Sequence, residues 1–395
     1  MQESSNQRTQ WGNLVAAVAT VACCDIATGL LLQLVPLLLE RQGTPAWLIG
    51  VNAAMGPIGI LLAGPLLPRV IGHFGSKAMA FVAVSLIILS LAAFKLFPSI
   101  WAWFLVRFVF GIMVGMLFTI SEAWVLTFAG EKSRGPIMGF YTSILAISFA
   151  VGPLILPFTG IDGWLPWLIG ITCVMLSALP LLAVNVSNVD FKPKDGATYF
   201  RFFRRAPILL LAVLAVTLFD NVYISFFTIF GMRSGLPLAT SSTILGTAII
   251  CNVFLFTPMG MLADRWSRPG VMMIASALTA VLCVSLPFVV ATWAIWPVMI
   301  LISAAAFGPY IIALATMGDQ FSGGDLIAGS AAISAMWGVG GLIGPPIAGA
   351  AIDAFGINAM PVTMAVFHGA LLALLLISRG QLVREAGPSL PKPSF

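Results

Sequence analysis

Apolar runs of about 20 residues recur along the whole chain, separated by short stretches that hold most of the charged residues. As a helix, a run of this length spans the roughly 30 Å hydrocarbon core of a bilayer. Backbone polar groups in lipid have to be satisfied within their own segment, so each run is predicted to be helical. The pattern predicts twelve spans, near residues 12–39, 46–71, 78–97, 99–128, 136–158, 163–185, 207–232, 239–262, 270–291, 294–317, 327–351 and 357–378.

The composition supports this interpretation. Of the 395 residues, 60% are hydrophobic and 8% are charged, whereas about a quarter of the residues in soluble domains are charged. The chain is therefore predicted to be a polytopic α-helical membrane protein. Its five cysteines all lie in apolar runs and show no CxxC or Cys/His metal spacing, which is typical of small buried hydrophobic residues.

The longest polar stretch, 185–205, divides six spans from six. We expect a six-helix bundle at 1–185, a cytoplasmic linker at 186–206, and a second bundle with a short cytoplasmic tail at 207–395. Within the linker, YFRFFRR at 199–205 alternates aromatic and basic residues. Such a segment is expected to lie on the inner membrane surface, with its rings in the interface and its arginines on lipid phosphates.

The basic residues predict the orientation. With a cytoplasmic N-terminus, fifteen lie on that side and three, Arg41, Lys95 and Arg233, on the other, which is a strong positive-inside asymmetry. Both termini are therefore expected in the cytoplasm, and the net charge of +5 indicates contact with anionic lipid and not with nucleic acid. An aromatic belt is expected at the outer ends, formed by Trp47, Trp101, Trp103, Trp164, Trp167, Trp293 and Trp296.

The two halves of the chain repeat one another at a nearly constant offset. Three anchors show it: Asp25 and Asp220 are 195 residues apart, Gly64 and Gly260 are 196 apart, and Gly152-Pro153 and Gly344-Pro345 are 192 apart. Two six-span halves of parallel type predict a pseudo-two-fold axis along the membrane normal, with a cavity between the halves.

Several of these segments resemble motifs of the major facilitator superfamily. GMLADRWSR at 260–268 resembles its loop motif, RFVFG at 107–111 its fourth-span motif, and Gly152-Pro153 the fifth-span motif of its antiporters. Residues 42–50 and SEAW at 121–124 resemble a drug-efflux-like branch. The resemblance implies an all-α membrane protein with twelve transmembrane helices in two six-helix pseudo-symmetric bundles, a monomer that transports a small molecule across a bacterial inner (plasma) membrane.

The loop motif indicates a cytoplasmic gate. Its members are Arg69, Asp264, Arg265 and Arg268, and the first copy of the motif is incomplete because Pro68 stands where an acid is expected. An acid at a helix end that faces basic residues can hold the inward side closed. A basic loop that only sets topology is the alternative interpretation.

The glycine and proline motifs predict close helix packing and bending. The residues concerned are Gly111, Gly152, Pro153, Gly344 and Pro345. Small residues let helices approach closely, and proline interrupts the backbone ladder. The resemblance to antiporters implies that the fifth-span motif blocks leak through the closed interface, but its presence in both halves equally favours general packing.

Four ionisable residues are predicted inside spans: Asp25, Arg107, Glu122 and Asp220. Such residues face a cavity or a partner, since an isolated charge at mid-bilayer costs about 2.5–3.5 kcal/mol or more. Asp25 and Asp220 each lie about 20 Å along their helix, near the midplane. Arg107 and Glu122 fall on one face of their span but roughly 22 Å apart, so they cannot pair with each other.

These residues are proton-coupling and substrate-binding candidates. A carboxylate removed from water binds a proton more readily, so Asp25 or Asp220 is expected to exchange protons, with Glu122 as a third candidate. Arg107 would modulate that exchange or hold an anionic substrate group. A purely structural pairing, such as Asp25 with Arg107 or Glu122 with a cytoplasmic base, is the alternative. Further candidates for substrate contact are Gln33, Asn52, Tyr141, Asn221, Tyr223 and Asn252.

The predicted function is secondary active transport by alternating access, with proton-coupled export of small amphiphilic organic molecules. One alternative is an importer or uniporter of an organic anion clamped by Arg107, and another is a non-transporting membrane receptor on the same fold. Because no nucleotide-binding loop, Ser-His-Asp arrangement or paired metal site is present, neither an ATP-driven pump nor an enzyme is expected. No cofactor or metal is predicted.

Overall fold

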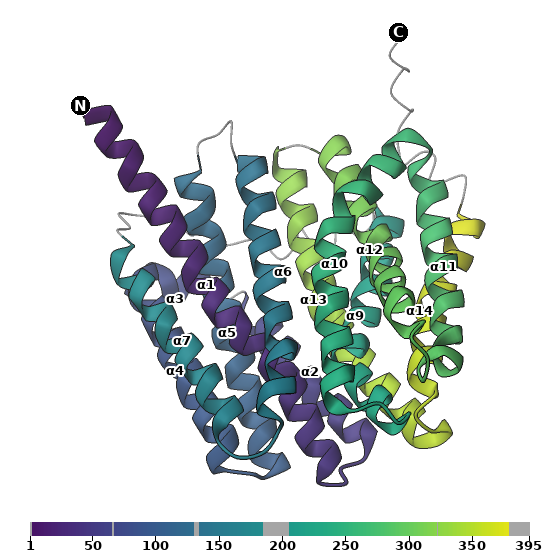
Figure 1. Ribbon diagram of the computed structural model, residues 1–395. Helices are drawn as coiled ribbons and strands as arrows, with labels where there is room; N and C mark the ends of the chain where they lie inside the picture. Colours follow the sequence, from purple (N-terminus) through teal and green to yellow (C-terminus); the bar gives the residue numbers. More distant parts are fainter. Residues whose placement is uncertain (1, 65–66, 130–133, 185–204, 322, 379–395) are drawn as a thin grey trace, which may run out of the picture.

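A computed structural model describes residues 2–64, 67–129, 134–184, 205–321 and 323–378 of the chain. Its helices run side by side as one bundle (Figure 1). Their bounds are α1 (Gln2–Arg41), α2 (Ala46–Ala63), α3 (Leu67–Phe74), α4 (Ser76–Leu96), α5 (Ile100–Phe128), α6 (Arg134–Thr159), α7 (Leu165–Ala183), α9 (Pro207–Arg233), α10 (Leu238–Arg265), α11 (Arg268–Val289), α12 (Ile295–Gln320), α13 (Gly323–Phe355) and α14 (Ala359–Ile377).

Within the described ranges, twelve of these helices are long and apolar enough to cross a membrane, which confirms the predicted number of spans. We call α1–α7 the N-terminal half and α9–α14 the C-terminal half. The predicted division at 186–206 remains a prediction, because residues 185–204, with the aromatic and basic segment, lie outside the described residues.

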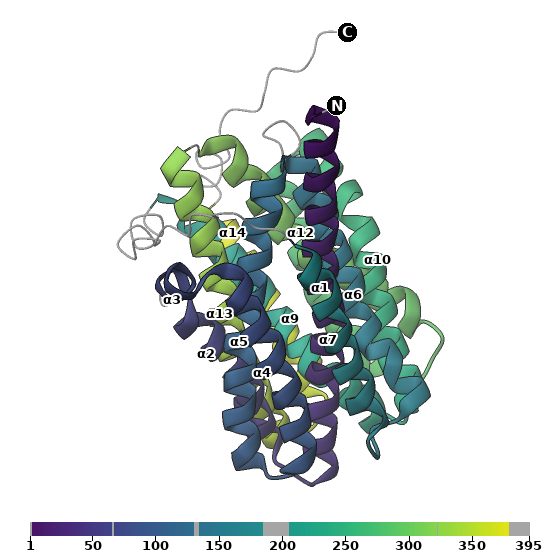
Figure 2. The same cartoon turned by 90° about the vertical axis from the view of Figure 1, so that its left-hand side faces the viewer.

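The second predicted span, 46–71, was wrong in its extent. The structure divides it into α2, which ends at Ala63, and the short helix α3. In the sequence Gly64 is followed by Pro65, and proline cannot continue a helix without loss of a hydrogen bond. Leu67 and Ile71 of α3 are buried while Arg69 is exposed, so α3 is an amphipathic helix at the edge of the bundle (Figure 2).

The same turn joins the first two helices of each half. Gly43 has a φ of 72° and is followed by Pro45 before α2, and Gly235 has a φ of 93° and is followed by Pro237 before α10. A positive φ favours glycine, which has no Cβ to clash, and proline is disposed to precede a helix. Each pair is 192 residues apart, so the repeat extends from the sequence to the backbone.

The predicted aromatic belt is only partly correct. Trp101 and Trp293 are strongly exposed at helix ends, whereas Trp103 and Trp167 are both 2% exposed. Trp103 donates its indole N–H to the Phe94 carbonyl at 2.9 Å, and Phe94 stacks on Trp167 with ring centroids 5.9 Å apart. Through Phe94, Trp103 and Trp167 join α5 and α7 to α4. The Trp103 indole can be buried because its N–H has an acceptor.

Candidate functional site

The two halves meet along two helix pairs that repeat each other. A Cβ added to Gly50 of α2 would collide with the backbone of Pro345 in α13, and one added to Gly246 of α10 would meet Ala150 and Leu154 of α6. Gly50 and Gly246 are 196 residues apart, the offset between the loop motifs. The α2–α13 and α6–α10 contacts are therefore pseudo-symmetric, and at both the absence of a side chain allows close approach.

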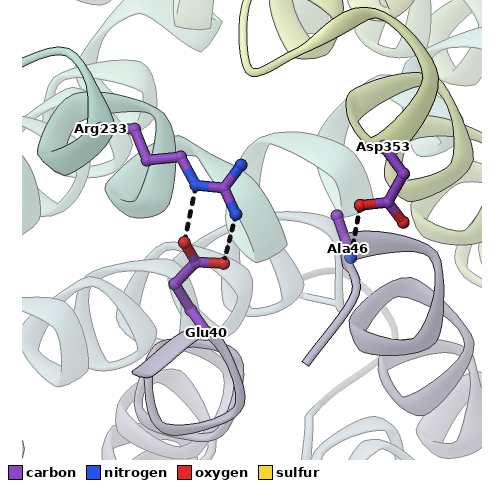
Figure 3. A network of polar contacts seen from close by, with 4 residues as sticks. All are labelled: Glu40, Ala46, Arg233 and Asp353. Atoms are coloured by element: carbon purple, nitrogen blue, oxygen red, sulfur yellow. Dashed lines mark hydrogen bonds and ion pairs between the residues drawn. The ribbon is translucent and has the colours of Figure 1, made fainter. Parts of the chain in front are cut away.

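One end of this interface is held by polar contacts between the halves (Figure 3). Asp353 near the end of α13 accepts hydrogen bonds from the backbone N–H groups of Ala46 and Trp47, at 2.9 and 2.8 Å. These are the first residues of α2, which no side chain of its own caps. A carboxylate suits a helix N-terminus, where free N–H groups and the positive end of the helix dipole lie.

At the same end, Arg233 of α9 forms a two-pronged ion pair with Glu40 of α1. The Arg233 Nε and Nη2 atoms donate to the two Glu40 carboxylate oxygens at 2.6 and 2.8 Å. We call this end, with Glu40, Ala46, Arg233 and Asp353, the latched end. The sequence analysis did not select its acids, although Arg233 stood out as one of three bases predicted on that side.

Gln33 connects α1 to α9 within the bundle, toward the latched end. It is 2% exposed, accepts a hydrogen bond from Thr228 at 2.7 Å, and donates to the Ile224 carbonyl. Its amide therefore has partners on the opposite half, and Gln33 lies in the interface between the halves and not on the wall of an open space.

The other end of the bundle, where α1 begins, has a different polar cluster. Arg268 at the start of α11 bonds Asp264 of α10 at 3.0 Å and Asp319 of α12 at 2.6 Å. All three residues belong to the C-terminal half, and we call this the Arg268 end. The structure thus brings together two of the four predicted gate residues, while Arg265 and Arg69 are exposed. Asp319 is an additional partner that the motif did not indicate.

Asp25 and Asp220 occupy matching places in α1 and α9, the two central helices. They are 5% and 8% exposed, and within the described part of the chain neither carboxylate has a hydrogen bond or an ion pair. The suggested pairing of Asp25 with Arg107 is not formed. Two buried acids without a counter-charge, one in each half, are the most unusual polar feature of the bundle.

A hydrogen bond joins α5 and α6 beside Glu122. Tyr141 of α6 hydrogen-bonds Ser121 of α5 at 2.6 Å. Tyr141 is 3% exposed, whereas Glu122, the next residue after Ser121, is exposed.

Arg107 is 1% exposed, in the part of α5 nearer to the latched end. Its Nη1 atom donates to the Asn52 side-chain oxygen of α2 at 3.2 Å, while its Nε atom and the Asn52 amide nitrogen have no hydrogen-bond partner among the described residues. No carboxylate pairs with this guanidinium there. Gly111 lies one turn further on, against the backbone of Gly56, which explains why α2 approaches α5 so closely.

The C-terminal half has its own group of polar side chains. Tyr223 stacks on Phe219, and His368 of α14 meets Phe219 edge-on at 5.2 Å between ring centroids. The Tyr223 hydroxyl and both His368 nitrogens are buried with no hydrogen-bond partner in the described ranges. Tyr223 follows Asp220 by three residues in α9, which places the two side chains on neighbouring positions of one helix face. The sequence analysis did not select His368, because a single histidine in an apolar run gives no pattern.

The two remaining polar candidates lie on α9 and α10. Asn221 donates to the Thr217 carbonyl at 2.8 Å, so its amide satisfies its own helix. Asn252 is 5% exposed, and its side-chain oxygen has no partner in the described part of the chain. Neither is brought to Asp25 or Glu122 by a contact in the structure.

The glycines of the two Gly-Pro motifs pack inside their own halves. Gly152 of α6 lies against the backbone of Gly29 and Leu30 in α1. A Cβ added to Gly344 of α13 would lie 2.8 Å from the Leu218 carbonyl oxygen of α9. These contacts favour general packing for both glycines. The prolines that follow them, Pro153 and Pro345, lie within α6 and α13, and Pro345 faces the opposite half at Gly50.

Comparisons with known proteins agree with this architecture. The MFS-type transporter YfkF of Bacillus subtilis (strain 168) is 26% identical over 273 residues, which cover 67% of this chain and 69% of that protein. The MFS-type transporter YcaD of Escherichia coli O17:K52:H18 (strain UMN026 / ExPEC) is 23% identical over 373 residues, 93% of this chain and 94% of YcaD.

Two solved structures share the fold. A bacterial homologue of the human lysosomal transporter Spinster, inward-facing and unoccupied, superposes with a TM-score of 0.80 at 13% identity, over 97% of this chain and 99% of the other. The nucleoside transporter NupG gives 0.77 at 15% identity, over 95% and 99%. The family model of the Major Facilitator Superfamily matches residues 17–323 and 236–394. The chain is therefore an integral, multi-pass membrane protein that belongs to the Major Facilitator Superfamily of secondary transporters.

Proposed function

We propose that this transporter exports small amphiphilic organic molecules in exchange for protons, by alternating access. The observation that carries the proposal is the pair of buried acids, Asp25 and Asp220, which have no ion pair or hydrogen bond among the described residues. An unpaired carboxylate is costly in an apolar interior, so a proton or a cationic group is the natural counter-charge. Alternating between the two would couple the substrate to protons.

The arrangement of contacts supports an inward-facing state. The hydrogen bonds and ion pairs that join α1 to α9 and α2 to α13 lie toward the latched end, whereas Arg268 forms ion pairs with two acids of its own half. The excess of basic residues would place the Arg268 end in the cytoplasm. The Spinster homologue that shares this fold was captured inward-facing, and we assign the same state to this chain.

The two glycine contacts offer a mechanism for the exchange. If the halves rock about the Gly50–Pro345 and Gly246–Ala150 contacts, the latched end opens as the Arg268 end closes. Opening the latched end would separate Asp353 from the N-terminus of α2 and Arg233 from Glu40. Closing the other end would bring the Arg268 cluster against the N-terminal half, which is the gating role predicted from its motif.

The proposal is tested with purified protein in liposomes that enclose a pH-sensitive dye. With an imposed pH gradient, a transported amphiphile is expected to accelerate proton flux, and Asp25→Asn or Asp220→Asn to abolish that acceleration. Asp162→Asn is the matched control, since Asp162 is 75% exposed and pairs with Arg41 in its own half. Substrate transport that persists without proton movement, or proton coupling intact in both aspartate variants, would refute the proposal.

Arg107 supports a second candidate, the transport of an organic anion. Its buried guanidinium has one hydrogen bond, to Asn52, and no carboxylate partner in the described part of the chain, and a guanidinium is well suited to bind a carboxylate. Uptake of organic anions that is lost in Arg107→Gln but retained in Asp25→Asn would favour this candidate over proton-coupled export. A non-transporting receptor would give no substrate-dependent flux in either assay.

A further inference from the structure

Two parallel helices of the N-terminal half, α2 and α5, cross at a pair of glycines. A Cβ added to Gly111 of α5 would lie 2.2 Å from the Gly56 carbonyl oxygen of α2. Asn52 and Arg107 each precede one of these glycines by four residues, about one helical turn. The crossing therefore holds the two polar side chains next to each other, and the Arg107 Nη1 atom donates to the Asn52 side-chain oxygen at 3.2 Å.

This pair of side chains has two donors left over and no acceptor for them. The Asn52 oxygen accepts from the guanidinium, so the other end of the amide is its NH₂ group, which can only donate. The Asn52 amide nitrogen and the Arg107 Nε atom are both buried, and neither has a hydrogen-bond partner among the described residues. One acceptor beside the pair is therefore what the local chemistry requires.

The same pair carries a positive charge that no acid balances. A guanidinium stays protonated in proteins, and within the described part of the chain Arg107 forms no ion pair with a carboxylate. The internal repeat does not reproduce this charge, because positions 299–303, at offsets of 192 to 196 from Arg107, hold no basic residue. A water molecule would accept a hydrogen bond here but would leave the charge uncompensated in an apolar interior.

We propose that Arg107 and Asn52 bind a small monovalent inorganic anion, of the size of chloride, between α2 and α5. Such an ion accepts hydrogen bonds from both leftover donors and supplies the single negative charge that the guanidinium lacks. Arg107 and Asn52 are 1% and 0% exposed, so an organic anion cannot reach them unless α2 and α5 separate. The bound ion would act as a fixed counter-charge that stabilises this half, whether or not transport is coupled to protons.

The test is thermal unfolding of the purified full-length protein in detergent, with sodium gluconate replaced stepwise by sodium chloride at constant ionic strength and pH. Gluconate has the same charge as chloride but is too large for a site between packed helices. A ligand that binds only the folded protein raises the unfolding temperature as its concentration rises. Chloride is expected to raise that of the wild-type protein by roughly 2–5 °C, with a response that saturates.

Two variants test whether the ion lies at this pair. Asn52→Asp places a carboxylate beside the guanidinium, so it is expected to unfold in gluconate at a temperature at least as high as the wild-type protein and to lose the response to chloride. Arg107→Gln removes the charge and is expected to lose the response as well. Arg41→Gln is the matched control, because Arg41 is 58% exposed in the same half, and it is expected to keep the full response.

The outcomes decide the inference independently of the proposed function. A wild-type unfolding temperature that does not depend on chloride would overturn the anion site, and it would mean that water alone satisfies the two donors. A chloride response that persists in Asn52→Asp and Arg107→Gln would place the ion elsewhere, and a response lost equally in Arg41→Gln would mean a general effect of net charge; either result overturns the site. Proton flux in liposomes does not enter any of these comparisons.

Discussion

The latched end supplies a prediction about the balance between the two conformations. Replacing Asp353 with Ala and Glu40 with Gln removes both charged partners that join the halves there. The protein is then expected to spend more time open at this end, because the lost contacts stabilise only the latched state. The population of each state, and not overall stability, is the quantity that should change.

The magnitude follows from the two contacts. Asp353 caps α2 from the opposite half with bonds of 2.9 and 2.8 Å, and an N-terminal cap contributes about 0.5–2 kcal/mol. The Arg233–Glu40 pair is partly exposed, with side chains 40% and 22% accessible, so solvent reduces it to about 0.2–1 kcal/mol. Together they favour the latched state by about 1–3 kcal/mol, roughly a 5- to 150-fold change in the ratio of populations.

Electron–electron double resonance measures this ratio directly. Spin labels at Gln42 and Asn358, in a background without native cysteines, report the separation of the halves at the latched end. The double variant is expected to add or enlarge a longer-distance component. Asp162→Asn is the matched control, because its partner Arg41 lies in the same half. A distance distribution unchanged by the double variant would refute the assignment of these contacts as a latch.

Three further predictions concern stability and can be checked by thermal unfolding. Gly50→Ala is expected to lower the unfolding temperature by several degrees, because the added Cβ would meet the backbone of Pro345. Gly56→Ala on the same helix is the control, and it is not expected to lower this temperature, because its Cβ would meet nothing within 4 Å. Asn52→Ala is expected to lower the free energy of unfolding by about 1–3 kcal/mol, because it removes the one hydrogen bond that the buried Arg107 side chain forms with a described residue; an unchanged unfolding temperature would contradict this. His368→Phe is expected to retain or raise stability, since neither ring nitrogen has a partner among the described residues; a marked loss would instead mean that the imidazole is hydrogen-bonded.

The fold could be predicted from the sequence because membrane insertion imposes a simple rule. Uninterrupted apolar runs have to be helices, and eleven of the twelve predicted spans correspond to single helices of the structure. The span 46–71 failed because α3 is still apolar, although it is too short to cross a bilayer. Trp103 and Trp167 were misassigned to the aromatic belt because sequence position gives depth but not the direction in which a side chain points.

The candidate site was predictable only residue by residue. Asp25 and Asp220 were evident as candidates, because an ionisable residue within an apolar run is costly and has to face a cavity or a partner. The roles of Glu40 and Asp353 could not be predicted, because these acids lie at helix ends, where charged residues are common. Gln33 was expected to line a cavity, yet it bonds the opposite half. Contacts between residues nearly 200 positions apart depend on how the halves dock, and a hydrophobic pattern does not contain that information.

The internal repeat distinguishes features that both halves share from residues that only one half has. Gly50 and Gly246 are counterparts in the two halves, and so are the turns at Gly43 and Gly235. The interface along which the halves would rock is therefore symmetric. Glu122 has no counterpart, because positions 314–318, which lie at offsets of 192 to 196, hold no acid. A symmetric pair of halves can present the same pathway alternately to each side of a membrane. Substrate preference requires that the two halves differ along the pathway, and position 122 is one place where they do.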